Sequence, residues 1–367
     1  MKAVCPREGL LSACQLASVA VPSRDVKPIL RNIKAVAGKT GWTLMATDLE
    51  LGLRLELRSV KVEKTGEALL PASRLTSILR EATDDELTIE ADASSTTVRG
   101  QNTEFVMPAE EPAEFPEIAS FGEDKYHEVP AGVLREMIRR TVFATAKESA
   151  RYSMTGVLWE FADNHAKLIA TDGRRLAVAT ASCTGKGAAD TKGQTHVVPA
   201  KAMGLLERLL QDGEEAVKVV LRPNEAMFQT DRAMIYTRLV EGRFPNYQEV
   251  IPKKAAIKIP VEAGKLLSAV RQAAIMTDEE SRRVIFTFSK GKVTLQAEAS
   301  ETGRSKVEMP LEYDGKELKI NFDAHFIGDM LRILPADTSL TLELVDPQTP
   351  ALFRCGPDYL YVVMPLT

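Results

Sequence analysis

The sequence predicts an α+β protein built from three similar domains in tandem, each with two helices and antiparallel sheets. Three observations lead to this prediction. A chain of 367 residues is too long for one ordinary hydrophobic core. Short segments recur along it at nearly constant spacing, and helical and strand periodicities alternate in the same order within each copy. Runs of short strands with few crossovers favour antiparallel sheets that carry helices on one face.

The recurring segments define the copies. An Ala-Thr-Asp segment, a Pro-Ala segment before a helical pattern, and a Phe-Pro segment each occur twice in the same order, at steps of 124, 128 and 129 residues. The pairs are 46–48 with 170–172, 69–79 with 197–210 and 114–118 with 243–247, and a weaker third copy comprises 292–309 and 318–334. Because charged, turn-like segments separate the copies, the predicted domains are 1–125, 126–253 and 254–367.

Each copy is predicted to contain two amphipathic helices and about eight short strands. The helical stretches place apolar residues three and four positions apart, as Leu134, Met137 and Ile138 do. The strand stretches are short and rich in β-branched and other apolar residues. The expected helices are 8–20, 73–81, 133–143, 200–211, 264–276 and 324–334, and the expected strands include 42–47, 51–57, 156–161, 167–171, 216–221, 235–240, 284–289, 292–297 and 340–345.

Charge is distributed unevenly between helices and the rest of the chain. The six expected helices together carry a net charge of +5, and the remainder carries −9 of the total of −4. Basic side chains on helices are most simply a solvated surface. The functional interpretation is one basic surface that contacts a polyanion through its phosphates, without reading bases. The residues alone leave both interpretations open, and no aromatic platform indicates stacking on single strands.

Motifs of common enzymes and of membrane proteins are absent from the sequence. It contains no GxxxxGK[ST], HExxH or GxSxG motif, and no GxGxxG after a strand. The glycine-rich segment 184–194 does not lead into a helix, so it is interpreted as a flexible surface loop. The four cysteines and four histidines are scattered without metal-ligand spacing. We therefore expect a non-enzymatic protein without cofactor or metal. Without a long apolar run or a signal-like N-terminus, we expect no membrane association and a cytoplasmic location.

Two features stand out from this background. Asp48 and Asp172 each follow a strand and a threonine, where a turn-forming aspartate is the ordinary interpretation. An alternative is a nucleotide-phosphate hydrolase that uses these aspartates with Arg174 and Arg175, although no motif favours it. The apolar C-terminal run 362–366 is either a closing strand or the wall of an apolar cleft. Another alternative is a cytoplasmic scaffold protein that does not bind DNA.

The segments ATDGRRLAV (170–178), LVEGRFPNYQEVIP (239–252) and YVVMP (361–365) together resemble the bacterial DNA sliding clamps, the beta subunits of replicative DNA polymerase. The resemblance covers the whole chain. It implies the DNA clamp fold, in which two three-domain chains join head to tail as a closed ring, with twelve helices around double-stranded DNA. It also implies a non-catalytic processivity factor. The implied partners are the DNA polymerase III catalytic subunit, the clamp loader and other replication and repair proteins that carry a clamp-binding motif.

The resemblance also implies three groups of site residues. Departures at Arg174, Glu249 and Ser281 leave the peptide preference open. For the apolar dimer residues, ordinary packing within a domain remains the alternative. The implied DNA-binding residues are Arg24, Arg80, Lys147, Arg151, Tyr152 and Lys201; the implied cleft for partner peptides, between domains 2 and 3, comprises Met154, Thr171, Gly173, Arg174, Arg175, Leu176, Pro245, Val250, Phe326, Val362, Val363, Met364, Pro365 and Leu366; the implied dimer interface comprises Arg74, Phe105, Met107, Ile275, Met276 and Glu301.

Overall fold

The structure of the protein, a computed structural model, describes residues 1–22, 27–147, 152–191, 193–210, 215–278, 282–300 and 303–366. The chain forms two compact units, each assembled from separate segments. Unit 1 comprises residues 1–135, 183–189 and 201–239, and unit 2 comprises residues 136–182, 190–200 and 240–367. Among the described helices, none has the length and apolar character needed to cross a membrane.

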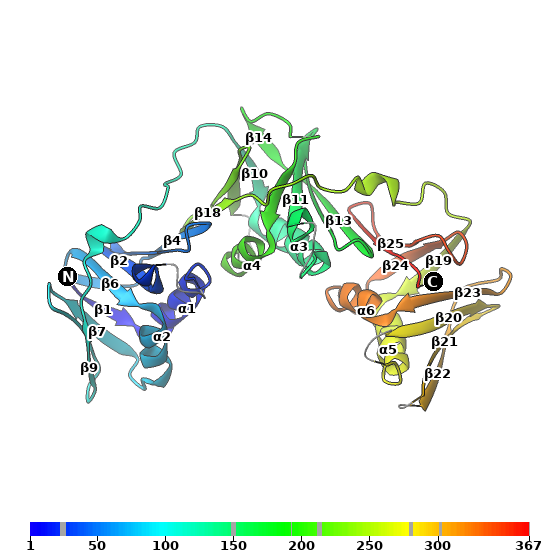
Figure 1. Cartoon of the computed structure of the whole chain (residues 1–367), viewed down its shortest axis with the longest axis horizontal. Helices are drawn as coiled ribbons and strands as arrows, with labels where there is room; N and C mark the ends of the chain where they lie inside the picture. The colour runs from blue at the N-terminus through cyan, green and yellow to red at the C-terminus, as the bar shows by residue number, and fades with distance from the viewer. Residues whose placement is uncertain are drawn as a thin grey trace. The chain divides into compact units, whose positions relative to one another are not determined.

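Unit 1 contains a five-stranded antiparallel sheet in the order β5-β1-β7-β8-β9. Helices α1 (Arg7–Ser18) and α2 (Ala72–Glu81) pack against each other in the same unit (Figure 1). Helix α1 buries Leu10, Ala13, Cys14 and Ala17, the three- and four-residue spacing of one helical face. The strands are β1 (Lys2–Pro6), β5 (Lys61–Lys64), β7 (Glu86–Ala91), β8 (Ser95–Arg99) and β9 (Glu104–Pro108).

The second sheet of unit 1 has nine antiparallel strands in the order β14-β10-β16-β17-β18-β4-β3-β2-β6. It joins the first two sequence repeats, because β4 of the first pairs with β18 of the second and sets Leu53 opposite Ile235. Both side chains are buried, so the junction is part of the core. The strands are β2 (Asn32–Gly38), β3 (Gly41–Thr47), β4 (Leu51–Leu57), β6 (Gly66–Pro71), β10 (Tyr126–Pro130), β14 (Thr184–Lys186), β16 (Ala216–Leu221), β17 (Glu225–Gln229) and β18 (Ala233–Arg238).

Unit 2 also has one large and one small sheet, built from the other half of the second repeat and from the third repeat. Its eight-stranded sheet runs β15-β11-β12-β13-β26-β25-β24-β19, and a four-stranded sheet runs β22-β21-β20-β23. Strands β13 and β26 join the two repeats, as β4 and β18 do in unit 1. The strands are β11 (Gly156–Ala162), β12 (His165–Thr171), β13 (Arg175–Ser182), β15 (His196–Pro199), β19 (Ile257–Glu262), β20 (Arg283–Ser289), β21 (Lys292–Ala299), β22 (Gly303–Pro310), β23 (Leu318–Asp323), β24 (Ser339–Leu344), β25 (Ala351–Cys355) and β26 (Tyr359–Val363).

With the remaining four helices, each repeat has two α-helices among the described residues. Helix α5 packs against α6 and against β22 (Figure 1). All six predicted helices are present. Most of their ends differ from the predicted ends by one or two residues, because helix termini lack the full set of backbone hydrogen bonds. The helices are α3 (Ala131–Thr141), α4 (Ala200–Leu209), α5 (Ala263–Ala274) and α6 (Ala324–Arg332).

The prediction of an α+β fold with antiparallel sheets is therefore confirmed, with two differences. Large sheets continue from one repeat into the next, so the compact units do not coincide with the repeats. The glycine-rich segment 184–194 was expected to be a loop throughout, but Thr184–Lys186 forms β14 and pairs with β10 at a sheet edge. An edge strand needs only one bonded neighbour, which three residues can supply.

Candidate functional site

The candidate site of unit 2 is organised by the turn between β12 and β13. Thr171 Oγ1 donates to the Arg175 carbonyl at 2.6 Å and accepts from the Gly173 N–H at 3.1 Å. Asp172 Oδ1 accepts from the N–H groups of Arg174 and Arg175 at 3.0 and 3.1 Å. Gly173 has a φ of +89°, a left-handed conformation that glycine adopts without steric penalty. The predicted hairpin turn is confirmed, and short side chains hold its shape.

Arg175 links this turn to neighbouring segments of unit 2. Its side chain is only 9% exposed. The guanidinium donates to Asp172 Oδ2 at 2.9 Å, to Asp329 Oδ2 at 2.8 Å and to the Phe143 carbonyl at 2.8 Å. It also lies 4.7 Å from the centre of the Phe326 ring, a cation–π contact. Arg175 therefore fastens β13 to α6 and to the short helix η3 (Val142–Ala144).

The protonation of Arg175 suits this structural role. Burial by itself lowers the pKa of the guanidinium, but Tyr361, Asp329 and Asp172 outweigh it and hold that pKa above its usual value. Burial also raises the pKa of Tyr361, whose hydroxyl donates to the Phe326 carbonyl at 2.8 Å. Neither group exchanges a proton near neutral pH. Among the described residues no cluster of His, Cys, Asp or Glu is arranged to hold a metal.

The C-terminal strand forms one wall of the site. Strand β26 pairs antiparallel with β13 and sets Val362 opposite Leu176. Just past the strand, the Met364 N–H donates to the Arg174 carbonyl at 2.8 Å. This bond places the Met364 side chain, which is 38% exposed, beside the turn. The apolar run predicted as either a closing strand or a cleft wall is both.

The linker after the second repeat also lines the site. Tyr247 begins the short helix η5 (Tyr247–Glu249) and donates from its hydroxyl to Glu160 Oε2 at 3.0 Å. Burial raises the pKa of Tyr247 to about 12, so its hydroxyl remains a donor at neutral pH. Asn246 Nδ2 donates to Glu249 Oε1 at 2.7 Å. The linker thus holds its own carboxylate beside Asn246.

These elements surround a cavity of about 190 Å³. Its walls are mainly apolar, and the exposed Arg174 is the charged residue at its rim. Such a cavity is suited to the apolar side chains of an extended peptide, while charged groups at the edge affect specificity. The lining residues are Met154, Thr171, Gly173, Arg174, Arg175, Leu176, Pro245, Asn246, Tyr247, Val250, Val362 and Met364.

The structure thus brings together ten of the residues that were assigned to the cleft, and adds two. Asn246 and Tyr247 were missed, although they belong to the Phe-Pro-Asn-Tyr segment that marks the sequence repeat. That repeat was a signal that these positions share the environment of their counterparts, Glu117 and Ile118. The cleft therefore depends on the linker as much as on the turn.

Four predicted cleft residues do not line the cavity. Val363 is fully buried and lies opposite Arg175 in the strand register, on the other face of the sheet from Val362 because side chains alternate along a strand. Pro365 and Leu366 lie beyond the cavity lining, and the Leu366 N–H donates to the Asn321 carbonyl at 2.9 Å. Phe326 lies against the Arg175 guanidinium.

The residues expected to contact DNA occupy several elements. Arg80 at the end of α2, Lys147, and Lys201 at the start of α4 are exposed. Lys201 Nζ also donates to Asp48 Oδ2 at 2.6 Å, in the first-repeat turn between β3 and β4. Tyr152 is the first residue of the short helix η4 (Tyr152–Met154). The other two predicted residues, Arg24 and Arg151, lie outside the described residues.

The residues expected at the dimer interface divide by exposure. Phe105 on β9 and Ile275 after α5 are 39% and 70% exposed, as an interface requires. Val106, which the sequence did not single out, is 61% exposed. Met107 is only 4% exposed and belongs to the core of its own unit, although Phe105 lies on the same face of β9. Of the remaining predicted residues, Arg74 is exposed, Met276 is half-buried and Glu301 lies outside the described residues.

Family models and known relatives match the chain along its length. Models of the N-terminal, central and C-terminal domains of the DNA polymerase III beta subunit match residues 1–119, 128–246 and 248–367. The beta sliding clamp of Chlamydia pneumoniae is 28% identical over 367 residues, covering 100% of this chain and 99% of the relative. That of Pseudomonas putida is 29% identical over 364 residues, covering 98% of each.

Solved structures agree with these relatives. The DNA polymerase III subunit beta of Pseudomonas aeruginosa superposes with a TM-score of 0.88 at 27% identity, over 100% of both chains. A sliding clamp of the same organism bound to griselimycin superposes with a TM-score of 0.90 at 28% identity, over 100% of this chain and 99% of the other. With three successive domain models matched and the fold shared throughout, the chain belongs to the family of DNA polymerase III beta subunits, the bacterial sliding clamps.

Proposed function

We propose that this protein is a non-catalytic processivity factor that acts in the cytoplasm. Two copies close head to tail into a ring, and domains 1–125, 126–253 and 254–367 of each copy surround double-stranded DNA. The ring slides without sequence specificity and tethers the catalytic subunit of DNA polymerase III. The excess positive charge of the helices supports this proposal, because contacts with phosphates do not depend on the base sequence.

The cleft beside β13 and β26 is the proposed docking site for partners. It receives short segments of the polymerase catalytic subunit, the clamp loader and other replication and repair proteins. The observation that carries the proposal is the apolar cavity between the Arg175-fastened turn, the linker and Met364. A relative with this fold has been solved with griselimycin bound, so the same compound is a suitable probe here.

The proposed ring closes through two different surfaces of each copy, as a head-to-tail dimer requires. Strand β9 ends one sheet of unit 1 and strand β22 ends one sheet of unit 2. Among the described residues each therefore has one side without a strand partner in its sheet, which is suited to pairing with another chain. Phe105 on one face of β9 and Val106 on the other are both exposed, and either can contact an apolar group such as the partner's Ile275.

The ring is tested by retention on DNA. Clamp loaded by its loader onto nicked circular plasmid should stay bound at high salt, and linearising the plasmid should release it. Simple electrostatic binding would instead weaken with salt on both substrates, because each phosphate contact releases counterions. Release from circular and linear DNA at the same rate would contradict the ring. A monomer in light scattering at micromolar concentration would also contradict it.

The cleft is tested by removing residues 364–367. Loss of the Met364 side chain removes one apolar wall, so griselimycin binding measured by calorimetry should fall by about tenfold or more. The deletion leaves β9 and β22 untouched, so the mass in light scattering should not change. A suitable control is Asp346→Asn, in an exposed loop of the same unit. Unaltered griselimycin binding after the deletion would contradict the cleft as the docking site, but it would not contradict the ring.

A further inference from the structure

Unit 1 contains a second pocket at the position that corresponds to the cleft of unit 2. Across β4 and β18, Gly52 lies opposite Tyr236. Across β13 and β26, Leu176 lies opposite Val362. Gly52 and Leu176 occupy the same position after the Thr-Asp turn of their repeats, so the two strand pairs correspond. The Phe-Pro linker of the first repeat also lines this pocket, as the Phe-Pro linker of the second repeat lines the cleft. We call this cavity of unit 1 the twin pocket.

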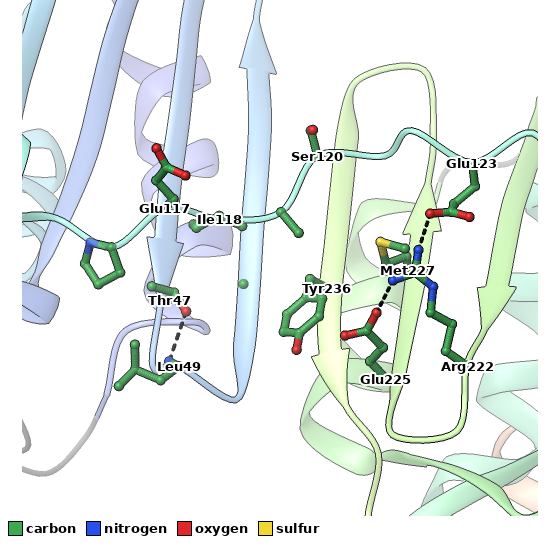
Figure 2. Close-up of a pocket in the computed structure, with 13 residues that line it drawn as sticks. Thr47, Leu49, Glu117, Ile118, Ser120, Glu123, Arg222, Glu225, Met227 and Tyr236 are labelled. Carbon is green, nitrogen blue, oxygen red and sulfur yellow. Dashed lines mark hydrogen bonds and ion pairs between the residues drawn. The ribbon is translucent and has the colours of Figure 1, made fainter.

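The twin pocket is larger than the cleft, about 430 Å³ against 190 Å³. Met227 and Ile118 are buried in its walls, and Tyr236 is half-buried. Figure 2 shows Leu49 on the turn at one side, Met227 on the other, and Tyr236 between them. The pocket therefore offers apolar contacts from Leu49, Met227 and Tyr236 among polar groups.

The twin pocket lacks a counterpart of the Leu176 side chain, which lines the cleft. Leu176 of the cleft corresponds to Gly52, and a Cβ at Gly52 would come within 2.9 Å of Ile118 Cγ2. The linker isoleucine therefore occupies the space of the missing side chain. Gly173 of the cleft corresponds to Leu49, which is 40% exposed. An apolar side chain thus stands at the rim of the twin pocket, where the cleft has none.

Charge separates the two sites further. The twin pocket is lined by three carboxylates, Glu117, Glu123 and Glu225, and by one guanidinium, Arg222. Arg222 is ion-paired to both Glu123 and Glu225 (Figure 2). The lining therefore carries a formal net charge of −2, whereas both charged residues that line the cleft, Arg174 and Arg175, are basic. A ligand that complements the twin pocket must be positively charged.

We propose that the twin pocket binds a short cationic segment of a protein partner, in which an aliphatic or aromatic side chain lies between lysines or arginines. The apolar side chain packs against Leu49, Met227 and Tyr236, and the basic groups face the carboxylates of the linker. Partners with acidic or neutral apolar segments use the cleft, and partners with basic apolar segments use the twin pocket. One copy of the chain then binds two classes of partner at the same time.

Methionine methyl NMR separates the two sites in one spectrum. Met227 lines the twin pocket, whereas Met154 and Met364 line the cleft. The full-length protein carries ¹³C-methyl methionine, and Met→Leu variants assign the three signals. The probe is an acetylated and amidated peptide, Lys-Leu-Lys-Phe-Leu-Lys, and its control has glutamate in place of each lysine.

The lysine peptide should shift the Met227 signal saturably and leave Met154 and Met364 unmoved. The glutamate peptide should bind there at least about tenfold more weakly, since its charges repel the carboxylates. Equal binding of the two peptides, no shift of Met227, or shifts confined to the cleft methionines would each overturn the proposal. Griselimycin added to the same sample reports on the cleft independently.

Two variants locate the peptide. Glu117→Lys reverses an exposed charge of the twin pocket, and Leu49→Asn removes the apolar rim with a residue that tolerates the left-handed backbone. Each should weaken the lysine peptide by about tenfold or less. Deletion of residues 364–367 is the matched control at the cleft, and it should leave the Met227 titration unchanged. Unchanged affinity in both twin-pocket variants would overturn the proposal, and the other methionine signals verify folding.

Discussion

The turn after β3 and the turn after β12 have the same backbone but different side chains. In the first repeat Thr47 Oγ1 donates to the Leu51 carbonyl at 2.9 Å, and Asp48 Oδ1 accepts from the N–H groups of Glu50 and Leu51 at 3.0 and 2.7 Å. The second repeat has the same bonds from Thr171 and Asp172. A Thr-Asp pair therefore specifies this turn wherever it follows the strand.

The difference lies at the third and fifth positions of the turn. The third is Leu49 in the first repeat, with a φ of +76°, and Gly173 in the second, with a φ of +89°. The fifth is the buried Leu51 in the first and the buried, ion-paired Arg175 in the second. The repeat thus keeps the backbone and changes the side chains, so one junction is fastened by apolar packing and the other by a cation. The following variants probe that contrast.

Arg175→Leu gives the second turn the residue of the first and should have the largest effect. It leaves Asp172 and the Phe143 carbonyl without their guanidinium, although Arg332 still pairs with Asp329. Stability should fall by about 2–3 kcal/mol, less than for a fully buried pair because both carboxylates are partly exposed. Urea denaturation measures this change. An unchanged midpoint would show that the cation does not fasten this junction.

Gly173→Leu also gives the second turn the residue of the first and should cost about 1 kcal/mol. A Cβ at Gly173 meets nothing within 4 Å, so the loss is the strain of a left-handed leucine. Leu49→Gly should change stability less, because relief of strain is offset by the entropy of glycine and by lost apolar contacts. Thermal unfolding of both variants tests this asymmetry. Equal and opposite shifts of the melting temperature would contradict it.

Tyr247 carries a phenolic hydroxyl that its counterpart Ile118 lacks, and this hydroxyl adds a pH dependence. Burial raises the pKa of Tyr247 from 10.0 to about 12, so the folded state holds its proton more tightly than the unfolded state. This contribution is fully present below pH 10 and is lost as pH rises toward 12. Tyr247→Phe should cost about 1 kcal/mol at pH 8 through the lost bond to Glu160. It should cost less at pH 11, and urea titrations at both values decide the sign.

Asp48→Asn should have the smallest effect on stability, below about 1 kcal/mol, because its ion pair with Lys201 is partly exposed. The asparagine oxygen still accepts the two backbone bonds of the turn. Released from Asp48, Lys201 is expected to bind phosphate more readily. The slope of log affinity against log salt for linear duplex DNA should then steepen by less than about one. Asp172→Asn, at the second turn, is the matched control and should leave that slope unchanged.

The repeat made both turns predictable, and with them the helices, the strands and the antiparallel sheets. Local patterns carried this information, because a Thr-Asp turn, a Pro-Ala helix start and an amphipathic face depend on neighbours in sequence. The cleft residues came from resemblance. Asn246 and Tyr247 were missed because their environment is made by strands far away along the chain.

The sequence by itself determined three similar α+β domains, two equivalent turns and an excess of positive charge on the helices. Only the tertiary structure decided that sheets continue across the repeats, that Arg175 is buried against Asp329, and that Lys201 is paired with Asp48. These contacts join residues 154 and 153 positions apart, a separation that periodicity does not encode. The twin pocket also belongs to this second group, because its carboxylates and apolar walls meet only when β4 and β18 pair. Local order follows from adjacent residues, whereas a site forms where distant strands meet.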